Sequence, residues 1–389
     1  MEEEHYSPDP PFETTYENLL NYNNYMTDHP LLDVSVVEEI ELPLIDLNKL
    51  DLGDYEKQAC KNQIARASQE WGFFQVINHG VSSEVLEKMR SEQVKLLKKP
   101  FIDKTKYKDL NFSAGSYRWG TPTATCLKQL SCLTMEQFGA IVSELAQKLA
   151  DILAEEMGKE SGFFKETCLP KTCYLRLNRY PACPIYPQML GIIPHTDSDF
   201  LTVVHQDDIG GLQLVKDGRW IAVKPNPKAL IINIGDLFQA WSNDVYKSVE
   251  HRVVANAHKE RFSTAYFYCP SYDTVIKSGV HEPGVYTSFS FGEYRKRVEE
   301  DVRIFGNKTG LSRFIGCKEE KYPSGIKSPG ARRRTPETES LATQFAAFGG
   351  CAAHAAVSNG DLMMNLRDGG VIGGPHSHYH WLFRHAGSM

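Results

Sequence analysis

The chain has 389 residues, and its composition (41% hydrophobic, 24% charged, 11% aromatic) excludes a mostly disordered, collagenous or coiled-coil protein. The 43 Lys and Arg residues against 49 Asp and Glu give a net charge of −6, which argues against binding nucleic acid through its phosphates. The 9 cysteines are an odd number and contain no C-x-x-C pair, so neither a disulfide framework nor a cysteine zinc site is expected.

The sequence contains no signal for the secretory pathway or for a membrane. Residues 1–5 are acidic and are not followed by an apolar stretch, so we do not expect a secretory signal. No stretch approaches the 18 or so uninterrupted apolar residues of a membrane helix. We therefore expect no membrane partner and a location in the cytoplasm, with the nucleus left open.

The predicted elements divide the first part of the chain in two. Residues 1–40 are polar and rich in Asn, Tyr and Pro, which predicts a weakly ordered arm. Residues 41–168 alternate between helical and strand-like spacing and predict an α/β region. Its helices are expected at 54–70, 82–98 and 135–158, and its strands at 41–47 and 71–80.

From residue 169 the pattern changes to short strands. Residues 169–275 predict an all-β sandwich or barrel, because β-rich runs are separated by Pro, Gly, Asn and Asp. Residues 276–318 predict a helical segment, with a helix at about 290–302. Residues 319–389 are rich in Gly, Ala, Ser and His and predict a disordered, low-complexity tail. The expected strands lie at 173–180, 200–206, 212–216, 219–224, 229–234, 250–256 and 262–269.

A candidate metal site begins with the H-x-D pair His195 and Asp197. Residues i and i+2 of a strand share one face, so the pair would direct an imidazole and a carboxylate to one point. His251, in a β-branched run, is a candidate third ligand. Two His and one carboxylate with open positions are the ligands of non-haem Fe(II) oxygenases. Two alternatives remain: a chance H-x-D pair, and a His251 that is hydrogen-bonded in the core.

Two further strands carry a candidate carboxylate site. Arg261 and Ser263 share a strand face, and a guanidinium with a hydroxyl suits the two oxygens of a carboxylate. On the other side of the H-x-D pair, Asn178 and Tyr180 offer an amide and a phenol on one face. The alternative for Arg261 is a solvated charge at the rim of a barrel.

Together, and in this order, these pieces resemble the plant soluble 2-oxoglutarate- and Fe(II)-dependent dioxygenases, from about Leu42 to Phe314. The resemblance implies a mainly β protein with flanking helices, in which a double-stranded β-helix (jelly roll) core follows an N-terminal α/β region. O₂ would be a co-substrate and ascorbate a candidate auxiliary reductant. The implied Fe(II) ligands are His195, Asp197 and His251. The implied 2-oxoglutarate contacts are Arg261, Ser263, Tyr180 and Asn178.

Within this family the chain is most similar to the gibberellin 2-oxidases, and to the branch that acts on twenty-carbon gibberellins. Residues 112–120, 177–184 and 233–243 carry this similarity. It implies 2β-hydroxylation, and so inactivation, of a small diterpenoid hormone. The candidate residues on the substrate side are Tyr117, Arg118 and Trp119, although Arg118 equally fits a surface Arg beside packed aromatics.

One departure from the relatives leaves other functions open. The relatives continue after the run that ends at Ser131 into a stretch resembling Trp-Ser-Glu-Ala-Phe-His, which supplies a strand beside the substrate pocket. Here Ser131 leads through Cys132 directly to the helix that begins at Met135. The alternatives are a splice-type variant with impaired catalysis, and an oxygenase of the same chemistry that acts on another plant metabolite such as a flavonoid.

Overall fold

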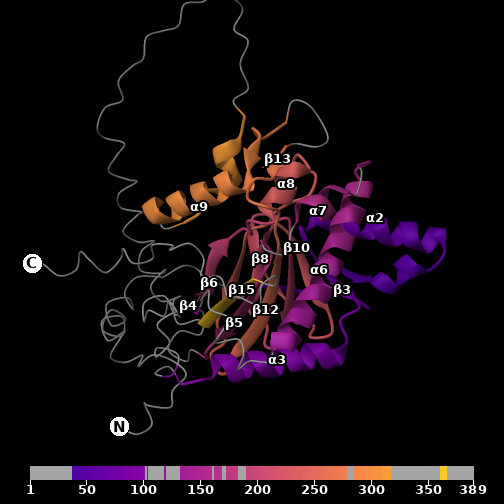
Figure 1. Cartoon of the computed structure of the whole chain (residues 1–389). Coiled ribbons are helices and arrows are strands. Elements are labelled where there is room, and N and C mark those ends of the chain that lie inside the picture. The colour runs from indigo at the N-terminus through magenta and orange to yellow at the C-terminus, as the bar shows by residue number, and fades with distance from the viewer. Residues whose placement is uncertain are drawn as a thin grey trace, which may run out of the picture.

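Two β-sheets of mixed strand direction lie at the centre of the molecule (Figure 1). The computed structural model describes residues 37–100, 103, 118–119, 132–159, 162–168, 172–182, 190–277, 284–305, 307–316 and 360–365. In order of pairing, the five-stranded sheet contains β1 (Glu39–Ile40), β9 (Arg219–Val223), β8 (Leu212–Lys216), β11 (His251–Val254) and β6 (Leu190–His195). The eight-stranded sheet contains β2 (Leu44–Asp46), β3 (Phe73–Ile77), β10 (Leu230–Ile234), β7 (Leu201–Gln206), β12 (Arg261–Tyr268), β5 (Tyr174–Tyr180), β15 (Gly360–Asn365) and β4 (Arg118–Trp119).

The order of the strands defines the fold. Along the chain, β5, β7, β10 and β12 belong to the eight-stranded sheet, whereas β6, β8, β9 and β11 belong to the five-stranded sheet. Apart from the β8–β9 hairpin, the chain thus crosses from one sheet to the other at each step. This is the double-stranded β-helix that the family resemblance implied. A separate antiparallel pair is formed by β13 (Val275–Ile276) and β14 (Phe289–Ser290).

The helices lie outside the sheets. Figure 1 shows α2, α3 and α6 on one side, and α8 and α9 near one end of the strands. Their bounds are α2 (Asp54–Glu70), α3 (Ser83–Leu97), α6 (Cys132–Glu155), α7 (Gly162–Thr167), α8 (Asp236–Trp241) and α9 (Phe291–Phe305), with 3₁₀ helices η2 (Leu47–Asp51) and η3 (Gly310–Phe314). No helix within these described ranges is both long and apolar enough to cross a membrane.

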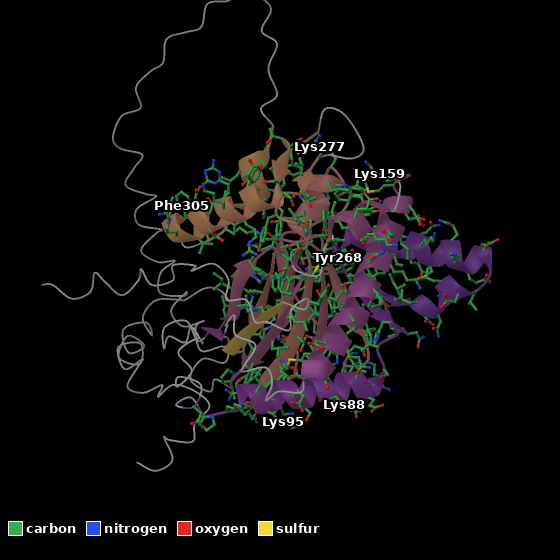
Figure 2. The ribbon with its side chains drawn as sticks, in the orientation of Figure 1. Lys88, Lys95, Lys159, Tyr268, Lys277 and Phe305 are labelled. Atoms are coloured by element: carbon green, nitrogen blue, oxygen red, sulfur yellow. The ribbon has the colours of Figure 1, made fainter. Side chains whose placement is uncertain are left out.

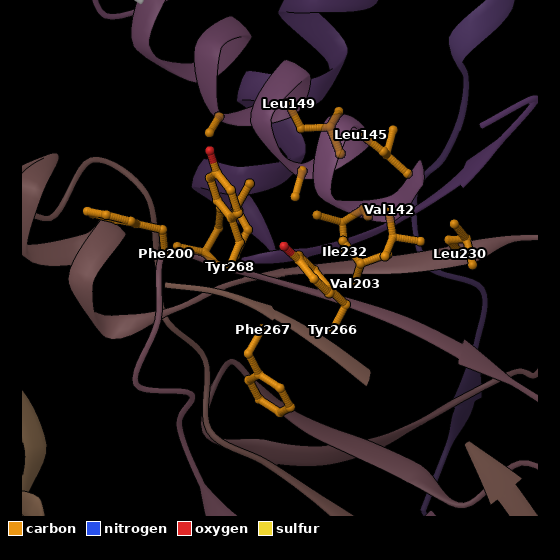
Figure 3. Packing of buried hydrophobic residues seen from close by; sticks show 14 of the residues in the cluster. Val142, Leu145, Leu149, Phe200, Val203, Leu230, Ile232, Tyr266, Phe267 and Tyr268 are labelled. Carbon is orange, nitrogen blue, oxygen red and sulfur yellow. The ribbon is translucent and has the colours of Figure 1, made fainter. Parts of the chain in front are cut away.

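Helix α6 covers the outer face of the eight-stranded sheet. Val142, Leu145 and Leu149 recur at helical spacing and are buried against the sheet. In Figure 3 they face Tyr266 and Tyr268 of β12, whereas the Phe267 side chain lies on the opposite side of that strand. This alternation follows from the two-residue period of a strand. The outer face therefore forms the main hydrophobic core, and the inner face turns toward the five-stranded sheet.

Helix α3 is joined to the same sheet by a buried polar side chain. Gln93 is 3% exposed, and its amide donates to the backbone oxygens of Asn178 (3.0 Å) and Ser263 (2.7 Å). These two residues are paired across β5 and β12. Lys88 and Lys95 lie on the outer side of the helix, where Figure 2 labels them. Helix α3 thus presents the Gln93 amide to the sheet and keeps Lys88 and Lys95 in solvent.

Several expected elements agree with the structure, and others need correction. The helix at 54–70 is confirmed, and the expected 290–302 helix is α9. Helices α7 and α8 were not expected, because each has only six residues and shows less than two turns of periodicity. Strand β6 was also not expected as a run of its own. Within the tail predicted to be disordered, Gly360–Asn365 instead pairs with β5, whose edge offers unpaired backbone groups.

Candidate active site

Two His side chains and one carboxylate meet at the end of the five-stranded sheet. His195 is the last residue of β6 and His251 the first of β11, and the two are directly paired across these strands. Nε2 of His195 lies 3.6 Å, and Nε2 of His251 3.7 Å, from Oδ1 of Asp197. One ligand atom from each residue lies within 4.8 Å of the others. This spacing fits one divalent cation bound on one side only, with its other positions open.

The convergence of these residues differs in one respect from the expected geometry. Asp197 is not in a strand, because β6 ends at His195. Its carboxylate reaches the imidazoles from the loop that follows, so the shared-face argument for His195 and Asp197 was wrong although the two side chains do meet. A loop can place the residue freely, whereas a strand continued to Asp197 would fix its face.

Backbone carbonyl groups orient both imidazoles. Nδ1 of His195 lies 2.8 Å from the oxygen of Ile193, and Nδ1 of His251 lies 3.0 Å from the oxygen of Val249. When each Nδ1–H donates to its carbonyl, each Nε2 keeps a lone pair directed at the site. Burial, followed by the nearby His195, lowers the pKa of His251 to about 4. His251 is therefore neutral near pH 7, as a metal ligand must be.

The two oxygens of Asp197 have different surroundings. Oδ2 accepts hydrogen bonds from the Thr202 hydroxyl (2.6 Å) and from the Asn233 side-chain amide (2.7 Å). Oδ1 faces the imidazoles. Burial by itself would raise the pKa of Asp197, but the neighbouring imidazoles and the Thr202 hydroxyl hold it well below its usual range. The carboxylate is therefore ionised, with one oxygen fixed and the other directed at the site.

A second cluster surrounds Arg261 on the inner face of β12, and Arg261 itself is only 2% exposed. The guanidinium donates to Oγ of Ser263 (3.3 Å) and to Oε1 of Gln206 (2.7 Å). The Asn178 amide also donates to the Ser263 oxygen, at 3.2 Å. The ring of Tyr180 lies under the guanidinium, 4.9 Å from Cζ to the ring centroid. Strand register explains the cluster, because Arg261 is paired with Tyr180 and Ser263 with Asn178.

The Arg261 cluster carries a positive charge without a matching carboxylate. Among the described residues, no Asp or Glu lies within ion-pair distance of Arg261. Nε of Arg261, Nε2 of Gln206 and Oδ1 of Asn178 are buried without a hydrogen-bond partner. An isolated buried charge is costly, so the cluster is a candidate anion site. Ser263 accepts two hydrogen bonds here and keeps its own proton to donate to an incoming carboxylate.

One apolar cluster between the sheets borders both the metal-ligand cluster and the Arg261 cluster. The Phe73 ring lies 5.2 Å from the His251 ring and belongs to the same apolar cluster as Tyr180. Thr202 and Asn233, which hold Asp197, come from the inner face of the sheet that also carries Arg261. A cavity of about 290 Å³ borders His195 and is also lined by Asp236, Glu250 and Lys308. An elongated dicarboxylate with a metal-chelating end suits this pairing of a cation site with an anion site.

The remaining candidate residues are those expected on the substrate side. Tyr117 lies outside the described residues. Arg118 and Trp119 form β4, which is separated from β5 by β15 in the eight-stranded sheet, and their side chains lie outside the described part. Sequence reasoning missed Thr202, Asn233 and Gln206. A signal for Asn233 was present, since one amide within an otherwise aliphatic strand must find a buried partner.

Comparisons with known proteins agree with this geometry. The model of the 2OG-Fe(II) oxygenase superfamily matches residues 171–270, and that of the non-haem dioxygenase in morphine synthesis N-terminal matches residues 42–144. Gibberellin 2-beta-dioxygenase 8 of Arabidopsis thaliana is 54% identical over 336 residues, covering 79% of this chain and 98% of that protein. Gibberellin 2-beta-dioxygenase 5 of Oryza sativa subsp. japonica is 48% identical over 346 residues, covering 81% and 99%.

Solved structures share the fold. The crystal structure of JOX2 in complex with 2OG, Fe, and JA has a TM-score of 0.59 at 29% identity, and the match covers 74% of this chain and 93% of that one. The crystal structure of a dioxygenase for auxin oxidation in rice has a TM-score of 0.58 at 26% identity, with 71% and 100% covered.

Fold and site together define an oxygenase that uses Fe(II) and 2-oxoglutarate. The chain belongs to the gibberellin 2-beta-dioxygenase family of these enzymes.

Proposed function

We propose that this protein hydroxylates gibberellins at the 2β position, with a preference for twenty-carbon gibberellins, and so inactivates them. The observation that carries the proposal is the presence of both the His195, Asp197 and His251 cluster and the buried Arg261 cluster, which border one apolar cluster between the sheets. The hormone class rests on the 54% identity to a gibberellin 2-beta-dioxygenase. The twenty-carbon preference rests on the resemblance of residues 112–120, 177–184 and 233–243 to that branch.

In this proposal the chain supplies position and charge. His195, Asp197 and His251 would hold Fe(II), whose chemistry when bound is the activation of dioxygen with 2-oxoglutarate as co-substrate. Arg261 and Ser263 would bind the distal carboxylate of 2-oxoglutarate, with Tyr180 and Asn178 shaping the site. A guanidinium that is already buried loses little further solvation when the carboxylate arrives, which favours tight and oriented binding.

On the substrate side, the proposal assigns residues 117–119. Arg118 is the candidate partner of a gibberellin carboxylate, and Tyr117 and Trp119 are candidate apolar contacts. An apolar pocket with one basic group suits a rigid terpenoid acid. If this assignment holds, Arg118→Met raises the KM for the gibberellin and leaves the KM for 2-oxoglutarate unchanged.

Turnover of 2-oxoglutarate tests the function directly. The full-length protein is supplied with Fe(II), 2-oxoglutarate and either a twenty-carbon gibberellin, a nineteen-carbon gibberellin or a flavonoid. We expect succinate release to be stimulated most by the twenty-carbon compound, with a 2β-hydroxylated product identified by mass spectrometry. Greater stimulation by the flavonoid, or hydroxylation at another carbon, would contradict the proposal.

A second candidate is a family member with impaired catalysis. The direct passage from Ser131 to the helix at Met135 favours it. The alignment to the 54% identical relative also runs over 336 residues while covering only 79% of this chain, so the relative contains residues without a counterpart here. Such a protein would bind Fe(II) and 2-oxoglutarate but lack part of its substrate pocket.

An insertion distinguishes the two candidates. The insertion is placed between Ser131 and Cys132. It consists of the residues of the 54% identical relative that follow its equivalent of Ser131 and have no counterpart here. If the native chain binds Fe(II) and 2-oxoglutarate but shows no gibberellin-stimulated turnover, and the insertion creates it, the impaired variant is correct. Turnover by the native chain at a rate equal to that of the insertion variant would exclude impairment.

A further inference from the structure

The Lys308 ammonium group lies against the loop that carries Asp197. Lys308 belongs to the segment between α9 and η3, and 11% of its side chain is exposed. Its Nζ donates to the backbone oxygen of Thr196 at 2.7 Å and to Oγ of Ser198 at 3.1 Å. Thr196 and Ser198 are the two neighbours of Asp197, so one side chain holds the loop on both sides of this residue.

The Asp236 carboxylate fixes the ammonium group in this position. Oδ2 of Asp236 lies 2.6 Å from Nζ of Lys308 and accepts a hydrogen bond from the Thr196 hydroxyl at 3.1 Å. The Tyr294 hydroxyl donates to the same oxygen. The backbone N–H of Asp236 donates to the backbone oxygen of Asp197 at 2.9 Å. One network therefore connects the C-terminal segment, the start of α8 and the loop that holds Asp197.

This loop needs such support. Residues 196–198 follow the end of β6 and belong to no strand, so no ladder of sheet hydrogen bonds holds their backbone. Thr202 and Asn233 hold one side-chain oxygen of Asp197, and the backbone N–H groups of Asp236 and Leu237 hold the main-chain oxygens of Asp197 and Asp199. Lys308 adds a bond to the main-chain oxygen of Thr196, on the other side of Asp197. A metal site tolerates only about half an ångström of error in its ligands, and partners outside the ligand set supply that accuracy.

We propose that Lys308 is a positioning residue for the metal site. By fixing the main chain at Thr196 and the side chain at Ser198, it sets the place of the Asp197 carboxylate relative to the two imidazoles. The inference rests on the metal site of the proposed function. Lys308→Met would leave the buried Asp236 carboxylate without its ion partner, so it should also lower the stability of the fold. The positioning role is therefore measured as the metal affinity of the folded protein, and also in Ser198→Ala, which keeps the ion pair.

The C-terminal segment has an independent anchor, which provides a control. Arg313 pairs with Asp301, and the backbone N–H of Thr309 donates to Oδ2 of Asp301 at 3.1 Å. Gly310, at φ +68°, is the first residue of η3, and a Cβ there would lie 3.3 Å from Cε of Lys308. Arg313 thus holds the same segment and, among the described residues, forms no hydrogen bond or ion pair with residues 196–198. Losing Arg313 loosens the segment while leaving the Lys308 contacts in place.

The test compares Lys308→Met with Arg313→Met in the full-length protein. Metal is removed with a chelator, and Co(II) is titrated while its visible absorption and dissociation constant are measured. We expect Lys308→Met to weaken Co(II) binding about tenfold and to alter the absorption spectrum. Arg313→Met should leave both unchanged. Ser198→Ala, which removes one acceptor of the ammonium group, should weaken binding in the same direction but less, and serves as the readout if Lys308→Met is insoluble.

The outcomes separate this inference from the function on which it rests. A native chain that binds no Co(II) overturns the metal site itself. A native chain that binds Co(II), with Lys308→Met or Ser198→Ala matching it in affinity and spectrum, overturns only the role of Lys308. Equal weakening by Arg313→Met also overturns it, because the effect would then belong to the whole segment. Weakening and a spectral change confined to Lys308→Met and Ser198→Ala support it.

Discussion

At Asp197 a single carboxylate performs two separate tasks. One oxygen is held by Thr202 and Asn233, and the other faces His195 and His251. The carboxylate stays ionised although it is buried, because the two imidazoles and the donated hydrogen bonds outweigh desolvation. The site therefore contains a buried, ionised carboxylate whose free oxygen faces the ring nitrogens of His195 and His251. Such an arrangement is more useful for binding a metal than for stabilising the fold.

Replacing the carboxylate should abolish metal binding and leave the fold intact. Asp197→Ala or His195→Ala removes one of three ligands, and we expect no measurable Fe(II) binding and no turnover of 2-oxoglutarate. Circular dichroism should match that of the unaltered protein. The control is His258→Ala, at an exposed His in the turn between β11 and β12, which should bind Fe(II) normally. Full activity in either ligand variant would show that the ligand assignment is incorrect.

The buried guanidinium of Arg261 makes a different prediction. Arg261→Met removes a charge-assisted bond worth about 1.5–3 kcal/mol, so the KM for 2-oxoglutarate should rise about tenfold to a hundredfold. Because this charge has no ionic partner among the described residues, the thermal stability of the ligand-free protein should not fall. The matched control is Arg252→Met, whose guanidinium stacks on Trp220 in the five-stranded sheet. An unchanged KM in Arg261→Met would rule out the carboxylate assignment.

At the scale of elements, the two faces of the eight-stranded sheet have different roles: one packs in the hydrophobic core, and the other carries polar residues of the candidate site. On β12, Phe262, Tyr266 and Tyr268 belong to the main hydrophobic core, whereas Arg261 and Ser263 turn inward to the anion site. The sheet must hold this alternation firmly, since a shift by one residue would exchange the two faces. Gln93 of α3 contributes by bonding β5 and β12 at one level of their pairing.

Removing the Gln93 amide should destabilise the fold rather than act on chemistry. Gln93→Met keeps the size of the side chain but loses bonds to two buried backbone oxygens, and we expect the free energy of unfolding to fall by about 1–3 kcal/mol. Lys95→Met on the exposed side of the same helix should change it by less than about 0.5 kcal/mol. Urea unfolding followed by circular dichroism measures both. Equal stability of the two variants would contradict the role given to Gln93.

At the scale of the whole molecule, the metal site lies where the two sheets approach each other. His195 and His251 come from the five-stranded sheet, and the residues that hold Asp197 come from the eight-stranded sheet. A bound cation would therefore tie the sheets together, and 2-oxoglutarate, reaching to Arg261, would extend that connection. Stability and occupancy of the site should be coupled.

Metal removal should consequently lower the stability of the entire chain. At a free metal concentration of about 100 times its dissociation constant, linkage gives about 2.7 kcal/mol of stabilisation, which should disappear on adding a chelator. Differential scanning calorimetry measures the shift, and 2-oxoglutarate should add a further increase only while metal is present. In Asp197→Ala neither addition should raise the unfolding temperature. A metal-dependent rise that persists in this variant would place the stabilising ion elsewhere.

The local patterns of the sequence were enough for several features. The helical spacing at 54–70 identified α2, and the two-residue period placed Arg261 and Ser263 on one strand face. The resemblance to known oxygenases supplied the jelly roll, which the strand order confirms. These features depend on residues close together in the chain, or on a pattern retained across a family, so they can be read without knowing the pairing of strands.

The tertiary structure alone decided which distant residues meet. Nothing local to His251 places it opposite His195, and nothing local to Asn233 directs it to Asp197; both follow from the register of strands distant in sequence. The same holds for Lys308, which reaches the Asp197 loop from beyond α9. Pairing register and chain crossing are properties of the assembled sheets, because each strand is fixed by its neighbours in space rather than in sequence. The amino-acid sequence determined which chemical groups were available, and the packing of two sheets determined which of them face one another.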